Sequence, residues 1–100
     1  MNTTINLPIN KSLREIEIEI SKIKTWNRYY VEHLDEYYRH KVLSAISINK
    51  DVDEVRDLLD HLHQTIYSQS YYIRGVGCMI VIHNWIGYTK LLETWLSLFS

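Results

Sequence analysis

The sequence predicts an all-α protein. We expect a helical hairpin, a three-helix bundle or a four-helix bundle, built on a long N-terminal amphipathic helix and assembled as a dimer. The chain of 100 residues contains only 3 Gly and 1 Pro, whereas a sandwich or barrel needs many turns. Apolar residues recur at helical spacing, and helix-start signals occur at Ser12 and Asp51. The length fits one helical domain over 11–100, after an extended lead-in at 1–10.

The first helix is expected over 12–48. Ser12 followed by Glu15 is a capping box, in which each side chain binds a backbone N–H that the helix start leaves unpaired. An unbroken helix of this length would span about 55 Å, so we expect it either to pair with a second subunit or to break near His40. The apolar residues keep the 3-4 spacing of a coiled-coil seam with one polar member, Asn27. The seam consists of Leu13, Ile16, Ile20, Ile23, Asn27, Tyr30, Leu34 and Tyr37.

Residues 14–20 also fit a β-strand. From Glu15 to Ile20, acidic and β-branched apolar residues alternate strictly, as they do in a half-buried strand. The 3-4 spacing continues well beyond this alternation, and no turn residue closes a hairpin. We therefore favour a helix here, with the strand as the alternative.

Two further helices are expected, at 51–74 and 78–99. Asp51 and Glu54 repeat the capping-box pattern, and the Gly-Val-Gly sequence between the two helices is a usual C-terminal stop. Charged and polar residues interrupt the apolar run of the last helix, and a membrane span needs about 20 nearly uncharged residues. We therefore expect a central buried helix, or one shared with a partner, and no membrane contact. The expected apolar stripes are Val52, Val55, Leu59, Leu62, Ile66 and Ile73 in the first of these helices, and Val81, Trp85, Tyr88, Leu92, Trp95 and Phe99 in the second, broadened there by Ile82, Ile86, Leu91, Leu96 and Leu98.

The histidines do not predict a metal site. His61 and His63 are two residues apart, so on a helix their side chains point roughly 200° from each other. A multi-cysteine zinc site is excluded because Cys78 is the only cysteine. We expect no metal and no cofactor, and we interpret the histidines as exposed residues on a polar face.

The spacing of one arginine and one histidine indicates an alternative function as an enzyme. Arg56 is followed by His61 after four intervening residues, which resembles the R-x4–6-H motif of HEPN-type ribonucleases, a family of small helical bundles. The resemblance implies that Arg56 and His61 act on the phosphate and 2′-hydroxyl of RNA, normally across a dimer. In such a pair the Arg braces the phosphate and the His moves a proton near neutral pH. Arg28 and His33 repeat the same spacing, so the motif names no family, and RNA cleavage or nucleotide binding is the second hypothesis.

The charge distribution argues against nucleic acid as the main partner. The formal net charge is −1, and acidic and basic residues are interspersed, whereas nucleic-acid binders usually carry a strong basic excess. A DNA-binding regulator is therefore the third hypothesis. The single cysteine and the absence of an apolar signal near the N-terminus predict a cytoplasmic protein.

Aromatic residues are the most unusual feature of the composition. The chain has 8 Tyr and 3 Trp but 1 Phe, and tyrosine is enriched at interfaces because its ring is apolar and its hydroxyl polar. The first hypothesis is a small non-enzymatic interaction module, such as a regulator, inhibitor, immunity factor or chaperone, that binds a protein partner and forms a homodimer. The many Ile, Asn, Lys and Tyr residues favour a phage or mobile-element origin. The predicted partner-binding residues are Arg28, Tyr29, Tyr38 and Arg39, together with the acidic residues Asp53, Asp57 and Asp60.

Overall fold

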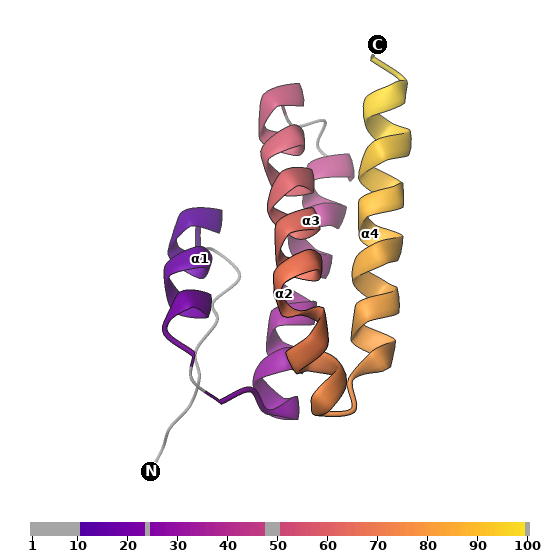
Figure 1. The fold of residues 1–100 in the computed structure, drawn as a ribbon. Helices are drawn as coiled ribbons and strands as arrows, with labels where there is room; N and C mark the ends of the chain where they lie inside the picture. Colours follow the sequence, from indigo (N-terminus) through magenta and orange to yellow (C-terminus); the bar gives the residue numbers. More distant parts are fainter. Residues whose placement is uncertain (1–10, 24, 48–50, 100) are drawn as a thin grey trace.

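The described part of the chain forms four α-helices. The structure is a computed structural model that describes residues 11–23, 25–47 and 51–99. Successive helices run in opposite directions and pack into a compact bundle (Figure 1). The all-α prediction is therefore confirmed. The helices are α1 (Leu13–Ser21), α2 (Arg28–Ser47), α3 (Val52–Gly75) and α4 (Met79–Ser97).

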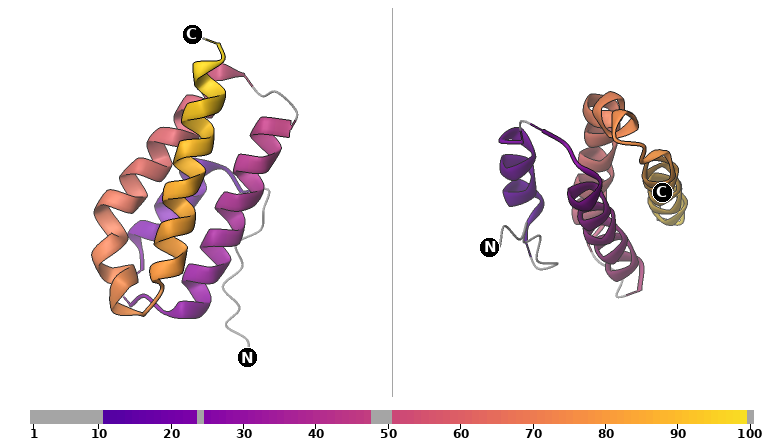
Figure 2. Two further views of the ribbon diagram at one scale, coloured as in Figure 1. Left: turned by 90° about the vertical axis from the view of Figure 1, so that its right-hand side faces the viewer. Right: turned by 90° about the horizontal axis from the view of Figure 1, so that it is seen from below.

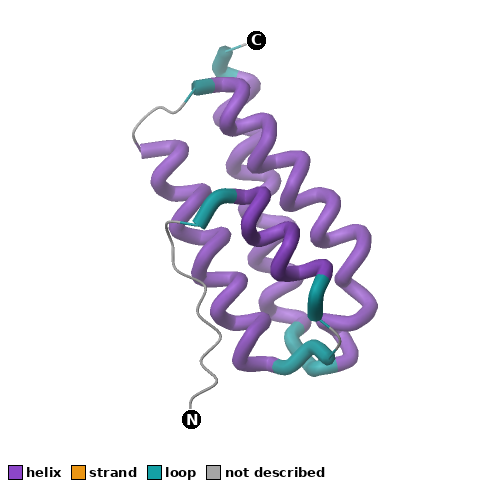
Figure 3. Tube along the Cα trace, turned by 90° about the vertical axis from the view of Figure 1, so that its left-hand side faces the viewer, coloured by secondary structure: helices purple, strands orange, loops and turns teal. Residues whose placement is uncertain are grey.

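The bundle has three layers. The helices α2 and α3 form the middle layer, α1 covers one side of this pair, and α4 covers the other side (Figure 2). From the α1 side, α1 lies in front of the middle pair (Figure 3). The two outer helices therefore each have one face turned toward the bundle and one face turned away from it.

The predicted continuous helix over 12–48 is wrong. The structure divides this segment into α1, which ends at Ser21, and α2, which begins at Arg28, whereas His40 lies inside α2. Asn27 was assigned to a core position of the seam, but it is exposed and caps α2. Its Oδ1 accepts a hydrogen bond from the backbone N–H of Tyr30 at 2.8 Å. The polar residue inside the apolar repeat therefore marks a helix start.

Folding back allows α1 to bury an apolar face against its own chain. Ile16 is fully buried, and the hydroxyl of Tyr37 donates a hydrogen bond to the carbonyl of Lys11 at 2.7 Å. In one continuous helix, Ile16 and Tyr37 would lie far apart along the axis, and the apolar face would need another chain to cover it. Because the chain folds back, the apolar face of α1 is covered by residues of the same chain.

The start of α1 follows the sequence signal. The Glu15 N–H donates to Ser12 Oγ and the Ser12 N–H donates to Glu15 Oε1, both at 3.2 Å, which completes the predicted capping box. Residues 14–20 lie within α1, so the strand alternative is wrong.

The helices α3 and α4 begin and end within two residues of their predicted bounds. The carboxylate of Asp51 caps α3 by accepting a hydrogen bond from the Asp53 N–H at 3.4 Å. The turn into α4 contains Gly77 with a φ of +78°, a left-handed conformation that favours glycine. The predicted lead-in at 1–10 lies outside the described residues.

The core lies between the middle layer and α4, around Trp85. This side chain is fully buried, packs edge-to-face on Tyr38 with ring centroids 5.2 Å apart, and donates its indole N–H to Asp35 at 3.1 Å. The other buried apolar residues of these helices are Tyr30, Val31, Leu34, Tyr37, Val42 and Ala45 of α2, Val55, Leu58, Leu62 and Ile73 of α3, and Val81, Ile82, Leu92 and Trp95 of α4.

The helix α4 is the most apolar of the described helices and packs on both α2 and α3. Neither it nor any other helix in the described ranges is long and apolar enough to cross a membrane.

Candidate functional site

An open groove runs between α1 and α3. Its middle part has a volume of about 400 Å³ and is bordered by Arg14 and Glu17 of α1 and by Asp57, Asp60 and His61 of α3. Hollows of about 340 Å³ and about 370 Å³ adjoin this part on its two sides and share lining residues with it. The three hollows therefore form one groove along the length of α1.

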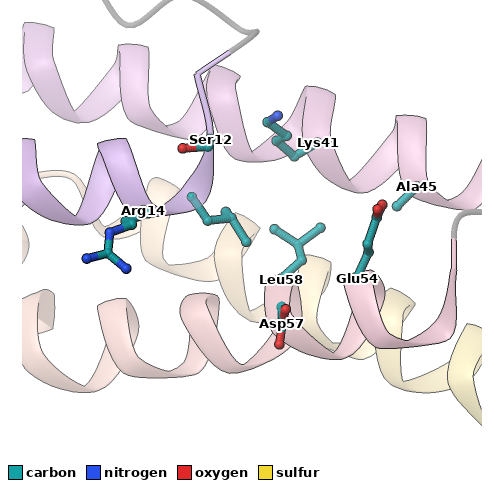
Figure 4. A pocket seen from close by; sticks show the side chains of 8 residues that line it. Ser12, Arg14, Lys41, Ala45, Glu54, Asp57 and Leu58 are labelled. Atoms are coloured by element: carbon teal, nitrogen blue, oxygen red, sulfur yellow. The ribbon is translucent and has the colours of Figure 1, made fainter.

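The groove carries both signs of charge. In the hollow near the start of α1, Lys41 of α2 lies on one side, Glu54 and Asp57 of α3 lie on the other, and Arg14 of α1 lies near its edge (Figure 4). A site for RNA or another polyanion needs an excess of positive charge. The electrostatics of this groove provide no such excess.

A chain of hydrogen bonds joins the wall of the groove to the core. His61 Nδ1 lies 3.4 Å from Glu17 Oε1, and His61 Nε2 lies 2.8 Å from the hydroxyl of Tyr38. The Tyr38 hydroxyl in turn lies 3.1 Å from Thr65 Oγ1. A neutral His61 with its proton on Nδ1 satisfies the whole chain: His61 donates to Glu17, Tyr38 donates to His61, and Thr65 donates to Tyr38. These hydrogen bonds connect α1, α3 and α2.

Burial keeps the central members of this chain uncharged. Desolvation lowers the pKa of His61 below its ordinary value of 6.5, although the Glu17 carboxylate acts in the opposite direction. Desolvation also raises the pKa of Tyr38 well above its ordinary value. Near neutral pH both side chains are therefore held in their neutral forms.

A carboxylate, an imidazole and a hydroxyl in series can activate a nucleophile. Here the hydroxyl belongs to Tyr38, which has 0% of its surface exposed, and Thr65 occupies its remaining hydrogen-bonding position. No substrate can reach that oxygen in this arrangement. The chain of hydrogen bonds instead fastens α1 to the middle layer.

Two sequence predictions are corrected by this arrangement. Tyr38 was expected on an exposed partner-binding surface, and the histidines were expected on a polar face, but Tyr38 and His61 are both buried. The buried face of α3 includes Leu58, His61 and Thr65 rather than the predicted Leu59 and Ile66, which are only partly buried. The 3-4 spacing from Leu58 through His61 to Thr65 was the signal that could have placed His61 inward.

The structure does not bring the predicted ribonuclease pair together within one chain. Five residues along a helix correspond to roughly 140° of rotation, so Arg56 and His61 point to different sides of α3. Arg56 is exposed, and its guanidinium lies 3.8 Å from the Asp53 carboxylate, whereas His61 faces Tyr38. In the other pair with this spacing, Arg28 and His33, the Nδ1 atom of His33 lies 2.9 Å from the carbonyl of Tyr29.

The predicted partner-binding residues also fail to form one surface. Arg28 and Tyr29 are exposed at the start of α2, beside Gly77 of the α3–α4 turn. Asp53 is exposed at the start of α3, at the opposite end of the bundle (Figure 1). Arg39 is exposed farther along α2. Asp57 and Asp60 border the α1–α3 groove.

The outward face of α4 exposes apolar side chains that the sequence predicted to be buried. Leu91 and Leu98 were expected to broaden a buried stripe, but their side chains are 49% and 75% exposed, and Ile80 is also 75% exposed. A side chain at Gly87 would meet no atom within 4 Å. These residues belong to a set with 4-3-4-3-4 spacing, which lies along one side of a helix. We call this set the outer row: Ile80, Asn84, Gly87, Leu91, Thr94 and Leu98.

The orientation of the outer row is set by a carboxylate beside α4, which accepts hydrogen bonds from this helix, including one from Asn84 at the edge of the row. Asp35 of α2 accepts hydrogen bonds from Trp85 Nε1 and the Tyr88 hydroxyl, both at 3.1 Å, and from Asn84 Nδ2 at 3.4 Å. Burial raises the pKa of Asp35 despite these donors. Because all three donors lie within five consecutive residues of α4, Asp35 fixes the rotation of this helix about its axis.

No metal centre is formed by the described residues, among which no three His, Cys, Asp or Glu side chains are grouped as ligands. The expectation that the protein has no cofactor stays a prediction.

Comparison with family models, with characterised proteins and with solved structures found no match to this chain.

Proposed function

We propose that the protein is a small non-enzymatic interaction module that binds another protein chain through the outer row of α4. The observation that carries this proposal is the exposure of Ile80, Leu91 and Leu98 on one side of a helix whose other side is packed. Soluble monomers rarely expose contiguous apolar patches larger than a few hundred Å², and such patches are typical of interaction sites. A regulator, inhibitor, immunity factor or chaperone would use a surface of this kind.

The chemistry of the outer row supports a protein partner. The row contains apolar, amide, hydroxyl and glycine positions but no charged residue, and the centres of protein interfaces are depleted in charge. The packing of Trp85 and the hydrogen bonds to Asp35 hold α4 rigidly. A rigid helix loses little conformational entropy when a partner covers it. The partner can be a different protein or a second copy of the chain, and we place the module in the cytoplasm.

A pull-down from the native host tests this proposal. Leu91→Glu puts a charge in the middle of the outer row, and Tyr67→Glu is the matched control because Tyr67 is exposed on α3 outside the row. We expect the wild type and Tyr67→Glu to retain one stoichiometric protein partner, and Leu91→Glu to lose it. Retention by Leu91→Glu, with loss on a substitution in the groove such as Arg14→Glu, would move the binding site to the α1–α3 groove and overturn the proposal.

The ribonuclease hypothesis has less support because His61 is engaged with Tyr38 and Glu17 and does not face Arg56. It predicts that Arg56→Ala removes RNA cleavage without affecting folding, since Arg56 is exposed. The proposal of DNA binding has no support from the formal net charge of −1, and salt-dependent binding to duplex DNA would be its test.

A further inference from the structure

The outer row of α4 has the same pattern when it is followed in either direction. Ile80 and Leu98 lie at its two ends, each equally far from residue 89. Asn84 and Thr94 are the next equidistant pair, and Gly87 and Leu91 are the innermost pair. Each pair is chemically matched: two branched apolar side chains, an amide with a hydroxyl, and a missing side chain with a large one.

We propose that a second copy of this chain covers the outer row, with the two α4 helices packed antiparallel about a two-fold axis beside residue 89. A two-fold interface uses the same surface on both chains, so it requires a self-complementary surface of this kind. The antiparallel arrangement brings Ile80 of each chain to Leu98 of the other and Asn84 to Thr94. It also inserts Leu91 of each chain into the space above Gly87 of the other. This inference rests on the proposed function of the outer row as an interaction surface.

A parallel pair of α4 helices would pack the residues of the outer row less well. It would set Gly87 against Gly87, which leaves a void, and Leu91 against Leu91. It would also bury two Asn84 amides side by side, whereas the antiparallel pair leaves Asn84 Nδ2 bonded to Asp35 and gives Asn84 Oδ1 a hydroxyl donor from Thr94. Among helix pairs that cover the row, the antiparallel one therefore fills the Gly87 space and pairs the polar groups.

The rest of the fold leaves this pairing accessible. The α1 helix covers the opposite side of the middle layer (Figure 2), so neither α1 nor the α1–α3 groove is covered when two α4 helices meet. The outer row extends over 18 residues, or about 27 Å. An interface built mainly on two helices of this length is at the small end of specific interfaces, so we expect a reversible dimer whose population depends on concentration.

Disulfide trapping tests the orientation of the two chains. In a Cys78→Ser background, one sample carries Ile80→Cys and a second carries Leu98→Cys. Both positions are 75% exposed, so the substitutions leave the core intact. We expect each sample alone to stay uncrosslinked under mild oxidation and the mixture to form a disulfide-linked dimer. A parallel pair would crosslink each sample by itself, which would overturn the proposal. A mixture of Tyr67→Cys and Tyr71→Cys is the control, since these exposed residues lie on α3.

Light scattering tests whether Gly87 receives a side chain from the second copy. Gly87→Met fills the space that Leu91 is proposed to occupy, and we expect it to raise the dimer dissociation constant about ten-fold or more. Gly75→Met is the matched control, because a side chain at Gly75 also meets nothing within 4 Å. The circular dichroism melting midpoint of Gly87→Met should not fall, since replacing an internal helical glycine favours the helix.

The outcomes separate this inference from the proposed function. A wild-type chain that stays monomeric over roughly a hundred-fold range of concentration overturns the dimer. If Leu91→Glu still abolishes capture of a different stoichiometric protein, the proposed function stands without the dimer. If Leu91→Glu changes neither the oligomeric state nor the captured protein, both proposals fail.

Discussion

The two outer helices of the bundle are attached in different ways. The inner side of α4 buries a row of large apolar side chains that includes Trp85, Leu92 and Trp95. The α1 helix has Ile16 as its one buried residue. Polar contacts supply much of its remaining attachment, through the Tyr37 hydroxyl to the backbone of Lys11 and through Glu17 to His61. One outer layer is therefore held mainly by apolar burial and the other largely by polar groups.

The two attachments respond differently to pH. The apolar contacts of α4 have no titratable member, but its hydrogen-bonding partner Asp35 does. Burial raises the pKa of Asp35, so ionisation of this carboxyl lowers stability as the pH rises. The hydrogen-bonded chain at α1 includes a histidine whose neutral form is favoured by burial, so its strength depends on pH. We expect α1 to open at a lower free energy than the other three helices.

The largest expected effect is on the α4 attachment. Trp85→Ala removes a fully buried ring and its hydrogen bond to Asp35, and we expect it to lower the free energy of unfolding by about 3–5 kcal/mol. Urea denaturation followed by circular dichroism measures this change. The control Lys90→Ala, at an exposed position of α4, should change it by less than about 0.5 kcal/mol. Equal effects of the two variants would show that α4 is not held by its inner side.

A second variant tests the apolar part of the α1 attachment. Ile16→Ala removes the buried side chain of α1, and we expect a loss of about 2–5 kcal/mol in local stability. Amide hydrogen exchange should show lost protection in α1 with little change in α4. If protection fell equally in all four helices, α1 would be part of one cooperative unit and the comparison between the outer layers would be wrong.

The hydrogen-bonded chain should contribute less than Ile16. Tyr38→Phe keeps the buried ring but leaves His61 Nε2 and Thr65 without their shared partner, so we expect a loss of about 1–3 kcal/mol in the free energy of unfolding. Thermal and urea denaturation measure it. Tyr67→Phe, at an exposed hydroxyl, is the matched control and should be neutral.

The smallest predicted effect is a pH dependence. Because the pKa of His61 is lower in the folded chain than its ordinary value of 6.5, the unfolded chain binds this proton first as the pH falls. The free energy of unfolding should therefore decrease as the pH is lowered through and below about 6.5. Urea denaturation at pH 7.5 and pH 5.5 measures the decrease.

The variant His61→Gln should remove the part of this pH dependence that comes from His61. His63→Gln, at an exposed histidine of the same helix, should retain it. If the free energy of unfolding of His61→Gln changed with pH as much as that of the wild type, His61 would not be the group that couples α1 to pH.

The sequence by itself determined the helical class and most helix ends. Ser12 with Glu15, Asp51 and Gly77 act on backbone groups within a few residues of themselves, so their effects can be recognised without knowing the fold. The strict alternation from Glu15 to Ile20 did not produce a strand, because the capping box and the longer apolar repeat favour a helix there.

Three features depend on tertiary packing: the division between α1 and α2, the burial of Tyr38 and His61, and the exposure of the outer row. An apolar repeat shows that one face of a helix will be covered, but it does not show by which helix. Asn27 fits both a polar core position and a helix cap, and the contact that Ile16 makes after the chain folds back selects the cap. Likewise α4 has apolar residues on more than one side, and the positions of α2 and α3 determine which side is packed. These choices depend on residues distant in sequence, since packing free energy belongs to the assembled layers rather than to any one helix.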